Sequence, residues 1–162
     1  MDVVLVRVDN RLVHGQILEA WIPHTKASCL AVVDDGVAND IFNETVVRMA
    51  VPHDIEVIVS GVEDFARNYV YGRGNGKRTI VLFSSIGHAF RAFTLGFRFA
   101  ELNIGNSYAE VCTKHCTTSV TLGDEDIHDI EALLDAGVAV ELRRIPRDRP
   151  IDVRKILRTN TS

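Results

Sequence analysis

The sequence is poor in cysteine, in positive charge and in long apolar runs, and each shortage excludes a class of protein. Its only cysteines are Cys29, Cys112 and Cys116, and their odd number and irregular spacing argue against a disulfide framework and favour a reducing compartment. The formal net charge is −4, whereas a nucleic-acid-binding protein normally presents a basic stripe. No window approaches the roughly 18 apolar residues of a membrane span, and the N-terminus is typical of neither a signal peptide nor a transit peptide. The composition therefore predicts a soluble cytoplasmic protein that binds no nucleic acid.

Apolar runs alternate with segments of helical periodicity along the whole chain of 162 residues. Continuous Val, Ile and Leu runs are typical of strands buried on both faces, as in parallel sheets. Strands that alternate with helices indicate right-handed crossover units. We therefore predict one α/β domain over residues 1–162, with a single open, mostly parallel sheet and helices on both faces. Strands are expected at 3–8, 28–34, 55–60, 79–83, 100–105, 118–122 and 138–145, and helices at 15–22, 38–51, 62–71, 86–93, 121–137 and near 152–158.

Local signals set the expected boundaries of two helices and the apolar face of a third. The first helix should stop before Pro23, because proline cannot continue a regular helix. Thr121 and Asp124 form the spacing of a capping box that begins a helix, and Gly137 supplies the left-handed residue that ends it. Helical spacing in the segment 38–51 places one set of residues on a common face. These residues are Ile41, Phe42, Thr45, Val46 and Met49.

Two short segments resemble ligand sites but have the wrong spacing. "GRGNGK" at 72–77 is rich in glycine, but three residues instead of four separate Gly72 from Gly76, and an arginine follows Lys77, so it departs from the nucleotide-binding pattern. We predict an exposed turn there. "CTKHC" at 112–116 offers too few ligands for a zinc site, which usually has four. The sequence therefore predicts no metal site.

Polar residues follow two predicted strands at the edge of the sheet where open α/β proteins bind ligands. Asp34 and Asp35 follow the second strand, and Ser84 and Ser85 follow the fourth. These side chains either face the ligand crevice or cap the helices that come next. Asp35 and Ser84 are candidate phosphate-binding or supporting residues, and both interpretations stay open.

The segment "RVDNRLVHGQILEAW" at 7–21 contains the strongest functional pattern. It leaves the first strand at its carboxyl end and opens a helix near Gly15, where unpaired N–H groups favour an anion. Arg11 can add bidentate hydrogen bonds to phosphate oxygens, and Asp9 can hold Arg11 or an imidazole in place. Neutral imidazole, with an ordinary pKa of about 6.5, is a competent nucleophile, and phosphoryl transfer depends mainly on positioning and charge stabilisation. The pattern suits a His14 that carries a phosphoryl group; the alternative is a loop histidine that caps the sheet edge.

The same segment resembles the N-terminal signature of the IIB component of the mannose/fructose/sorbose family of the bacterial phosphoenolpyruvate-dependent sugar phosphotransferase system. Members typically carry R-[IV]-D-x-R-[LI]-[IV]-H-G-Q-[VI] followed by a tryptophan. "VVDDGVAND" at 32–40, "LNIGNSYAE" at 102–110 and the segment 120–146 also resemble parts of that family. Asn10 departs from it, since an acid is common there, and "GNSYAEVCTK" at 105–114 departs from its Gly-Gly-Met loop. The matching signature positions are Arg7, Asp9, Arg11, Leu12, His14, Gly15, Gln16 and Trp21.

The resemblance implies a protein-N(π)-phosphohistidine–sugar phosphotransferase. His14 would accept a phosphoryl group from a phosphohistidine on a IIA protein or domain, and would pass it to a sugar that membrane IIC/IID components import. Arg11 would bind the phosphoryl oxygens and Asp9 would support the site, without metal, nucleotide or other cofactor, in a cytoplasmic protein peripherally associated with the permease. The alternative is a regulatory phosphohistidine protein that signals to a partner without phosphorylating sugar, and a homo-oligomer stays open. The remaining candidate phosphate-binding or supporting residues are Asn10, Gly15 and Gln16.

Overall fold

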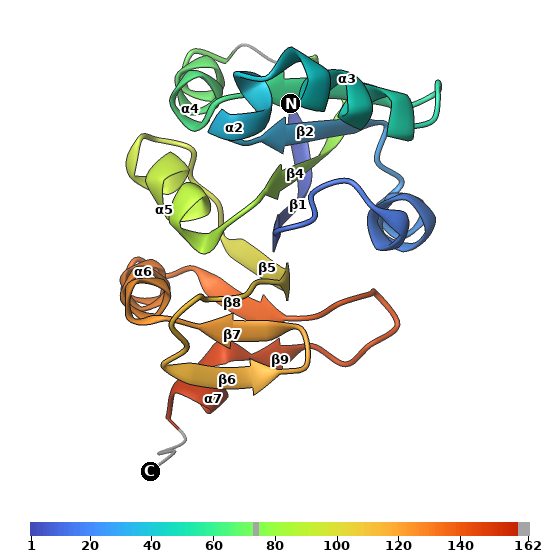
Figure 1. Ribbon diagram of the computed structural model, residues 1–162. Helices are drawn as coiled ribbons and strands as arrows, with labels where there is room; N and C mark the ends of the chain where they lie inside the picture. The colour runs from blue at the N-terminus through green and yellow to red at the C-terminus, as the bar shows by residue number, and fades with distance from the viewer. Residues whose placement is uncertain (73–74, 159–162) are drawn as a thin grey trace.

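A seven-stranded sheet with the order β3-β2-β4-β1-β5-β8-β9 forms the centre of the computed structural model, which describes residues 1–72 and 75–158 (Figure 1). The strands from β3 to β8 in this order run parallel, and β9 is antiparallel to β8. A separate antiparallel pair, β6 and β7, lies outside this sheet. The strands are β1 (Asp2–Asp9), β2 (Cys29–Val33), β3 (Glu56–Ser60), β4 (Arg78–Phe83), β5 (Glu101–Asn106), β6 (Lys114–Thr117), β7 (Val120–Leu122), β8 (Ala139–Leu142) and β9 (Ile151–Asp152).

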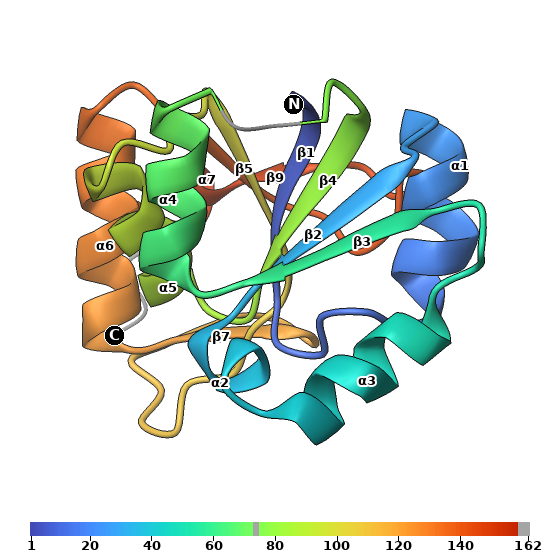
Figure 2. The ribbon, with the colours of Figure 1, turned by 90° about the horizontal axis from the view of Figure 1, so that it is seen from above.

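Helices lie on both faces of the sheet, which confirms the predicted fold class. Figure 2 shows α4, α5 and α6 on one face, and α1 and α3 on the other. The helices are η1 (Ile17–Trp21, a π-helix), α1 (Ile22–Thr25), α2 (Asp35–Ala38), α3 (Ile41–Ala50), α4 (Val62–Val70), α5 (Ile86–Thr94), α6 (Asp124–Asp135) and α7 (Val153–Leu157). No helix within residues 1–72 and 75–158 is long and apolar enough to cross a membrane.

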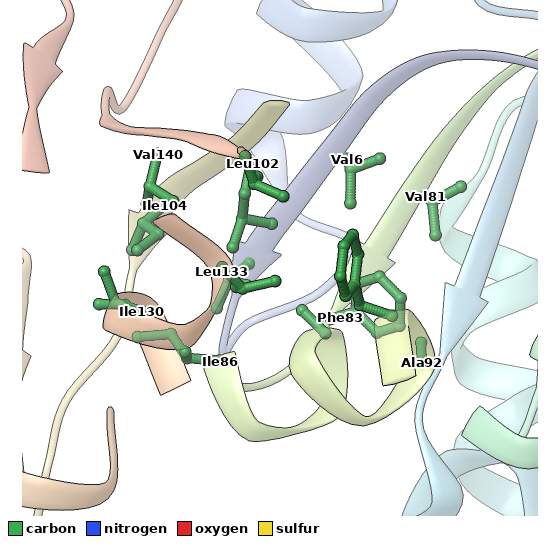
Figure 3. Packing of buried hydrophobic residues seen from close by; sticks show 14 of the residues in the cluster. Val6, Val81, Phe83, Ile86, Ala92, Leu102, Ile104, Ile130, Leu133 and Val140 are labelled. Carbon is green, nitrogen blue, oxygen red and sulfur yellow. The ribbon is translucent and has the colours of Figure 1, made fainter. Parts of the chain in front are cut away.

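Two apolar cores, one on each face of the sheet, explain why the strands are continuously hydrophobic. Side chains alternate between the two faces of a strand. In β4, Val81 and Phe83 therefore join the core beneath α5 and α6 (Figure 3), while Ile80 and Leu82 join the opposite core. That second core also contains the buried side chain of Trp21. Through Leu12, Ile17 and Trp21, the second core packs the segment after β1 against the sheet.

The helix expected at 15–22 continues through Pro23 and ends at Lys26, so the predicted stop before Pro23 is wrong. The N–H of Ile22 donates to the carbonyl of Ile17, five residues earlier, which is the wide turn of a π-helix. Pro23 lies directly after this turn, at the beginning of α1, where a missing N–H costs little. Lys26 then ends the helix with a φ of 56° in the left-handed region.

The segment expected to form a strand at 118–122 is the hairpin strand β7 and not a strand of the main sheet. Its partner β6 and the edge strand β9 were not predicted, and both are short. The predicted capping box is also displaced: the N-cap of α6 is Gly123, whose N–H donates to Asp126 Oδ2 at 2.9 Å. The hydroxyl of Thr121 instead accepts from the N–H of Ala109. Gly137 ends this helix as predicted, with a φ of 91°.

The helix expected at 38–51 corresponds to α3, which begins at Ile41, and a separate short helix, α2, precedes it. An aspartate caps each of the two helices. Asp34 accepts from the N–H of Val37, and Asp40 accepts from that of Phe42. The apolar face expected on this segment lies on α3, but it points to solvent. Its exposed fractions are 84% for Ile41, 75% for Phe42, 50% for Val46 and 80% for Met49.

The predicted turn at 72–77 is described only in part. Gly72 and Gly76 have φ angles of 69° and 71°, in the left-handed region that turns use. Residues 73–74 of this turn and residues 159–162 of the predicted domain lie outside the described residues.

Candidate active site

The chain reverses sharply at the carboxyl end of β1, and this turn places Arg11 and His14 next to Asp9. The N–H of Leu12 donates to the carbonyl of Asp9 at 2.9 Å. Leu12 has a φ of 57°, a left-handed conformation that costs a residue with a side chain about 1–2 kcal/mol. Its side chain is 8% exposed and belongs to the second core, and this burial offsets the strain.

The carboxylate of Asp9 is the centre of the site and is fully buried. Its Oδ1 accepts from the backbone N–H and the Nε of Arg11, both at 3.1 Å. Its Oδ2 accepts from Nη2 of Arg7 and Nη2 of Arg11, each at 3.1 Å, and lies 2.8 Å from His14 Nε2. Burial by itself would raise the pKa of Asp9, but the hydrogen bonds from His14 and Arg11 and the charge of Arg7 outweigh it and hold that pKa well below its usual range. Asp9 is therefore an anion at neutral pH.

The contact with Asp9 determines which nitrogen of His14 is available for chemistry. An ionised carboxylate can only accept hydrogen bonds, so Nε2 of His14 must be the donor in this contact. In a neutral imidazole the proton then lies on Nε2, and Nδ1 keeps its lone pair. The N–H of Gln16 approaches Nδ1 at a long 3.4 Å. The side chain of His14 is 15% exposed, so its ring is held in place but is accessible from solvent.

Arg11 and Gln16 place a positive charge and an amide beside this ring. Arg11 Nη2 donates to Gln16 Oε1 at 3.0 Å in addition to its bonds with Asp9. The side chain of Arg11 is 42% exposed, so its guanidinium borders solvent near His14. The predicted residues Asp9, Arg11, His14 and Gln16 thus form one hydrogen-bonded network, in which an oxyanion near the ring would meet a cation and a backbone N–H.

A buried arginine supports the network from within the sheet. Arg7 is fully buried, and its Nη1 donates to Asn103 Oδ1 at 2.6 Å and to the carbonyl of Arg143 at 2.8 Å. Its Nη2 donates to Asp9 and to the carbonyl of Arg144 at 3.0 Å. Burial lowers the pKa of Arg7, and Asp9 acts in the opposite direction. The two buried side chains therefore keep each other charged.

Gly105 and Trp21 complete the surroundings of Arg7. A Cβ on Gly105 would lie 1.8 Å from Arg7 Nη2, so only glycine leaves room for the guanidinium at this position of β5. The ring centre of Trp21 is 5.3 Å from Arg7 Cζ, within the range of a cation–π interaction. Trp21 Nε1 also donates to the carbonyl of Arg144 at 2.9 Å.

Two further predicted residues lie on the same loop but outside the network around Asp9. Asn10 is joined to the end of β5, because its N–H donates to the carbonyl of Asn106 at 3.0 Å and its Oδ1 accepts from Asn106 Nδ2. Gly15 is exposed, and a Cβ there would meet no atom within 4 Å. Packing within the chain therefore does not require glycine at position 15.

Asp35 and Ser84 belong to a different network, at the ends of β2 and β4. Ser84 Oγ donates to Asp34 and lies 3.1 Å from His88 Nδ1. Asp35 accepts from the N–H of Val62 at the first turn of α4 and pairs with Arg91 at 3.0 Å. Among the described residues, no hydrogen bond connects these side chains to Asp9, Arg11 or His14. The aspartates here satisfy helix N-termini, which is the capping interpretation of this segment.

The sequence interpretation missed the supporting role of Arg7 and Gly105. Arg7 offered a signal, because a charged residue inside an apolar strand is almost never buried without a partner. Arg7 and Asp9 are also two residues apart in one strand, so they share a face. Gly105 offered no signal, since the close approach of Arg7 arises only when β1 and β5 pair.

The fold and this network define an open α/β protein with a histidine held at the carboxyl edge of its sheet. The family model "PTS system sorbose subfamily IIB component" matches residues 3–162. The chain is 32% identical to the PTS system fructose-specific EIIB component of Bacillus subtilis (strain 168). The alignment spans 161 residues and covers 99% of each chain. It is 28% identical to the PTS system sorbose-specific EIIB component of Klebsiella pneumoniae, over 94% of this chain and 93% of that one. The chain belongs to the sorbose subfamily of IIB components of the sugar phosphotransferase system.

A solved structure and a longer relative agree with this assignment. The IIBSor domain of the sorbose permease from Klebsiella pneumoniae superposes with a TM-score of 0.88 at 27% identity, covering 97% of this chain and 96% of that chain. The PTS system mannose-specific EIIAB component of Escherichia coli (strain K12) is 27% identical over 91% of this chain, which spans 46% of that longer protein.

Proposed function

We propose that His14 is a phosphoryl carrier, which accepts the group from a phosphohistidine on a IIA protein and passes it to a sugar that membrane IIC/IID components import. The single observation that supports this most directly is the 2.8 Å contact between Asp9 Oδ2 and His14 Nε2. It leaves Nδ1 as the nucleophilic atom of a ring that is fixed but accessible. Membership of the IIB family independently supports the same function.

In both steps of the transfer, the bonds formed and broken and the protons balance without a cofactor. The lone pair of His14 Nδ1 forms a bond to phosphorus while the P–N bond of the donor histidine breaks. The donor ring, protonated on its other nitrogen, leaves as neutral imidazole. His14 becomes a phosphohistidine that still has its proton on Nε2, and the positive charge of that ring lies against the Asp9 carboxylate. In the second step the P–N bond to His14 breaks, a sugar hydroxyl oxygen binds phosphorus, and the hydroxyl proton is released.

Arg11 and the backbone N–H of Gln16 are proposed to stabilise the phosphoryl oxygens. Charge spreads over the equatorial oxygens in the transition state, so fixed positive groups at this point lower the barrier. Arg11 already lies beside the ring and is 42% exposed. One of its nitrogens can turn from Asp9 or Gln16 to an oxygen of the phosphoryl group with little movement.

Relatives of stated function support the proposed partners and location. A relative named as a mannose-specific EIIAB component joins IIA and IIB in one protein, which supports a IIA protein as the phosphoryl donor. A relative of known structure is described as a domain of the sorbose permease, which supports a membrane permease as the later partner. We propose that residues 1–162 act as one domain at the cytoplasmic face of that permease.

The test is labelling with radioactive phosphoenolpyruvate, the general phosphotransferase proteins and the IIA protein of the same system. Wild type should acquire an acid-labile, base-stable label, and His14→Ala should acquire none while its circular dichroism stays unchanged. His53→Ala, at an exposed histidine, is the matched control and should label like wild type. Full labelling of His14→Ala would end the proposal.

A second assay separates transport from regulation. Membranes that contain the IIC and IID components should form sugar phosphate when the phosphorylated protein is added. A protein that keeps its label in the presence of permease and every tested sugar would instead be the regulatory phosphohistidine protein.

A further inference from the structure

The outward side of α3 is an apolar surface for which the rest of the described chain provides no cover. We call Ile41, Phe42, Val46 and Met49 the α3 face. The opposite side of the helix contacts the protein, since Val47 packs against the second core and Val51 is part of it. A contiguous apolar surface of this kind on a soluble protein usually marks an interaction site.

The α3 face lies at the edge of the sheet that bears His14. Figure 2 shows α3 beside the chain that leaves β1, at the carboxyl end of the strands. Val13, which precedes His14, and Val47 on α3 both pack against the second core, on the same face of the sheet. A protein that approaches His14 from solvent therefore meets α3 as its neighbour.

A second apolar segment lies along the same edge, beyond the histidine loop. The chain between β5 and β6, gold in Figure 2, includes Tyr108 and Val111, which are 57% and 81% exposed. Large exposed side chains thus occur on both sides of the loop that holds His14. This distribution suits a partner that covers the loop and rests on both flanks.

We propose that the α3 face is a docking surface for the phosphorylated IIA protein, a proposal that rests on the function proposed above. Transfer between two histidines requires the reacting atoms to come within about 3–3.5 Å, so the donor must cover His14 itself. A specific interface buries about 800 Å² on each partner, far more than one histidine loop offers. The contact must therefore extend onto adjacent elements, and α3 presents the apolar side chains that occupy the centre of such interfaces.

The composition and size of the α3 face favour a transient partner over a second copy of the chain. Obligate dimers bury 2,000 Å² or more in total, which four side chains on a short helix do not supply. Phe42 and Met49 are residue types enriched in the cores of interfaces, and polar rims are typical around them. Asp40 and the ion pair between Glu44 and Arg48, at 2.9 Å, provide such a rim.

The experiment compares two double variants that remove exposed apolar side chains from opposite edges of the sheet. Phe42→Ser/Met49→Ser changes the α3 face, and Val70→Ser/Leu95→Ser is the matched control at the far ends of α4 and α5. Val70 and Leu95 are 57% and 45% exposed, so neither variant should lose its fold, which thermal melting checks. Single-turnover phosphoryl transfer is then measured against the concentration of phosphorylated IIA protein.

We expect the α3 variant to lose tenfold or more in the second-order rate constant of transfer, because a higher concentration of phosphorylated IIA protein is needed for the half-maximal rate. The control should stay within twofold of wild type. Chemical phosphorylation of His14 by phosphoramidate, which needs no protein donor, should be equal in all three proteins. Transfer from IIA at the wild-type rate in the α3 variant would overturn the docking proposal and leave the phosphocarrier function intact. A wild-type protein that takes label from phosphoramidate but none from charged IIA would overturn both.

Two other results would assign the face to a different occupant and so overturn the proposal. One is normal transfer from IIA with slow sugar phosphorylation by permease membranes, which would place the permease on α3. The other is a wild-type dimer in sedimentation that Phe42→Ser/Met49→Ser dissociates without any change in transfer from IIA.

Discussion

Asp9 Oδ2 lies 2.8 Å from His14 Nε2, and this one contact fixes both the orientation and the tautomer of the ring. The same oxygen accepts from Arg7, a fully buried cation. The hydrogen bonds from His14 and Arg11, together with the charge of Arg7, keep Asp9 ionised, and the ionised carboxylate keeps the proton of His14 on Nε2. The buried side chain of Arg7 is thereby linked to His14 Nδ1, the proposed nucleophile.

The first prediction is that phosphorylation occurs on Nδ1 of His14. Nε2 is occupied by its hydrogen bond to Asp9, whereas Nδ1 faces only the long contact with the N–H of Gln16. Long-range ¹H–¹⁵N correlation spectra of protein labelled at histidine distinguish the two isomers, before and after phosphorylation. A phosphoryl group on Nε2 would show that the ring leaves Asp9 before it reacts.

The second prediction concerns Arg11, which should matter for rate and little for stability. Its side chain is 42% exposed, and Arg11→Ala should slow single-turnover transfer by about 10²–10³-fold, as the loss of one preorganised charge-stabilising donor does. Arg11→Lys keeps the charge but not the planar fork, and should recover only part of the rate. Equal rates for Arg11→Ala and wild type would remove this residue from the mechanism.

The third prediction is strong coupling between Asp9 and Arg7 in the free energy of unfolding. Asp9→Asn leaves the Arg7 charge buried without its counterion and should cost about 3–5 kcal/mol. Arg7→Met leaves Asp9 with Arg11 and His14 as partners, and it removes a cation whose Nε has no hydrogen-bond partner among the described residues. The double variant should therefore lose much less than the sum of the two single losses. Urea unfolding of all four proteins gives the coupling, and simple additivity would contradict it.

The main sheet was predictable because it depends on local patterns. The Val, Ile and Leu runs predict strands buried on both faces. β2 is buried along its whole length, whereas the edge strand β3 is only partly buried. The short strands β6 and β9 were missed because they are too short and polar for a periodic signal. The π-turn at Ile17–Trp21 was also missed, since nothing in the spacing of apolar residues distinguishes a five-residue turn from a regular one.

The residues of the site that are close together in the sequence could be predicted, whereas a contact between residues far apart in the sequence could not. Asp9, Arg11, His14 and Gln16 lie on one turn, and the structure brings them into one network. The space that Gly105 leaves for the Arg7 guanidinium depends on β5 lying next to β1, which no local pattern records. The α3 face shows a different limit of prediction from sequence. Helical spacing identifies an apolar side of a helix, but it does not indicate whether that side packs on the sheet or is exposed to solvent.

The fourth prediction concerns the close approach of the Arg7 guanidinium to Gly105. A Cβ at position 105 would overlap Arg7 Nη2 at 1.8 Å, so Gly105→Ala should destabilise the protein by about 1–3 kcal/mol or more, as overpacking does. It should also slow phosphoryl transfer, because Arg7 must move away from Asp9. In an Arg7→Met background the same change should cost less, since a flexible thioether can yield. An equal cost in both backgrounds would show that the guanidinium is not what glycine accommodates.

The fifth prediction is a specific loss of stability in acid. The pKa of Asp9 is lowered in the folded protein, whereas an unfolded aspartate has a pKa of about 3.9. The unfolded state therefore binds a proton first as the pH falls, so the stability contributed by Asp9 is complete above about pH 4 and is lost below it. For one buried group the slope approaches about 1.4 kcal/mol per pH unit. The matched protein is Arg7→Met/Asp9→Asn, which lacks this titration, so below about pH 4 the unfolding free energy of wild type should fall relative to that of the double variant. Parallel profiles down to pH 2.5 would mean that Asp9 is not the stabilised anion that orients His14.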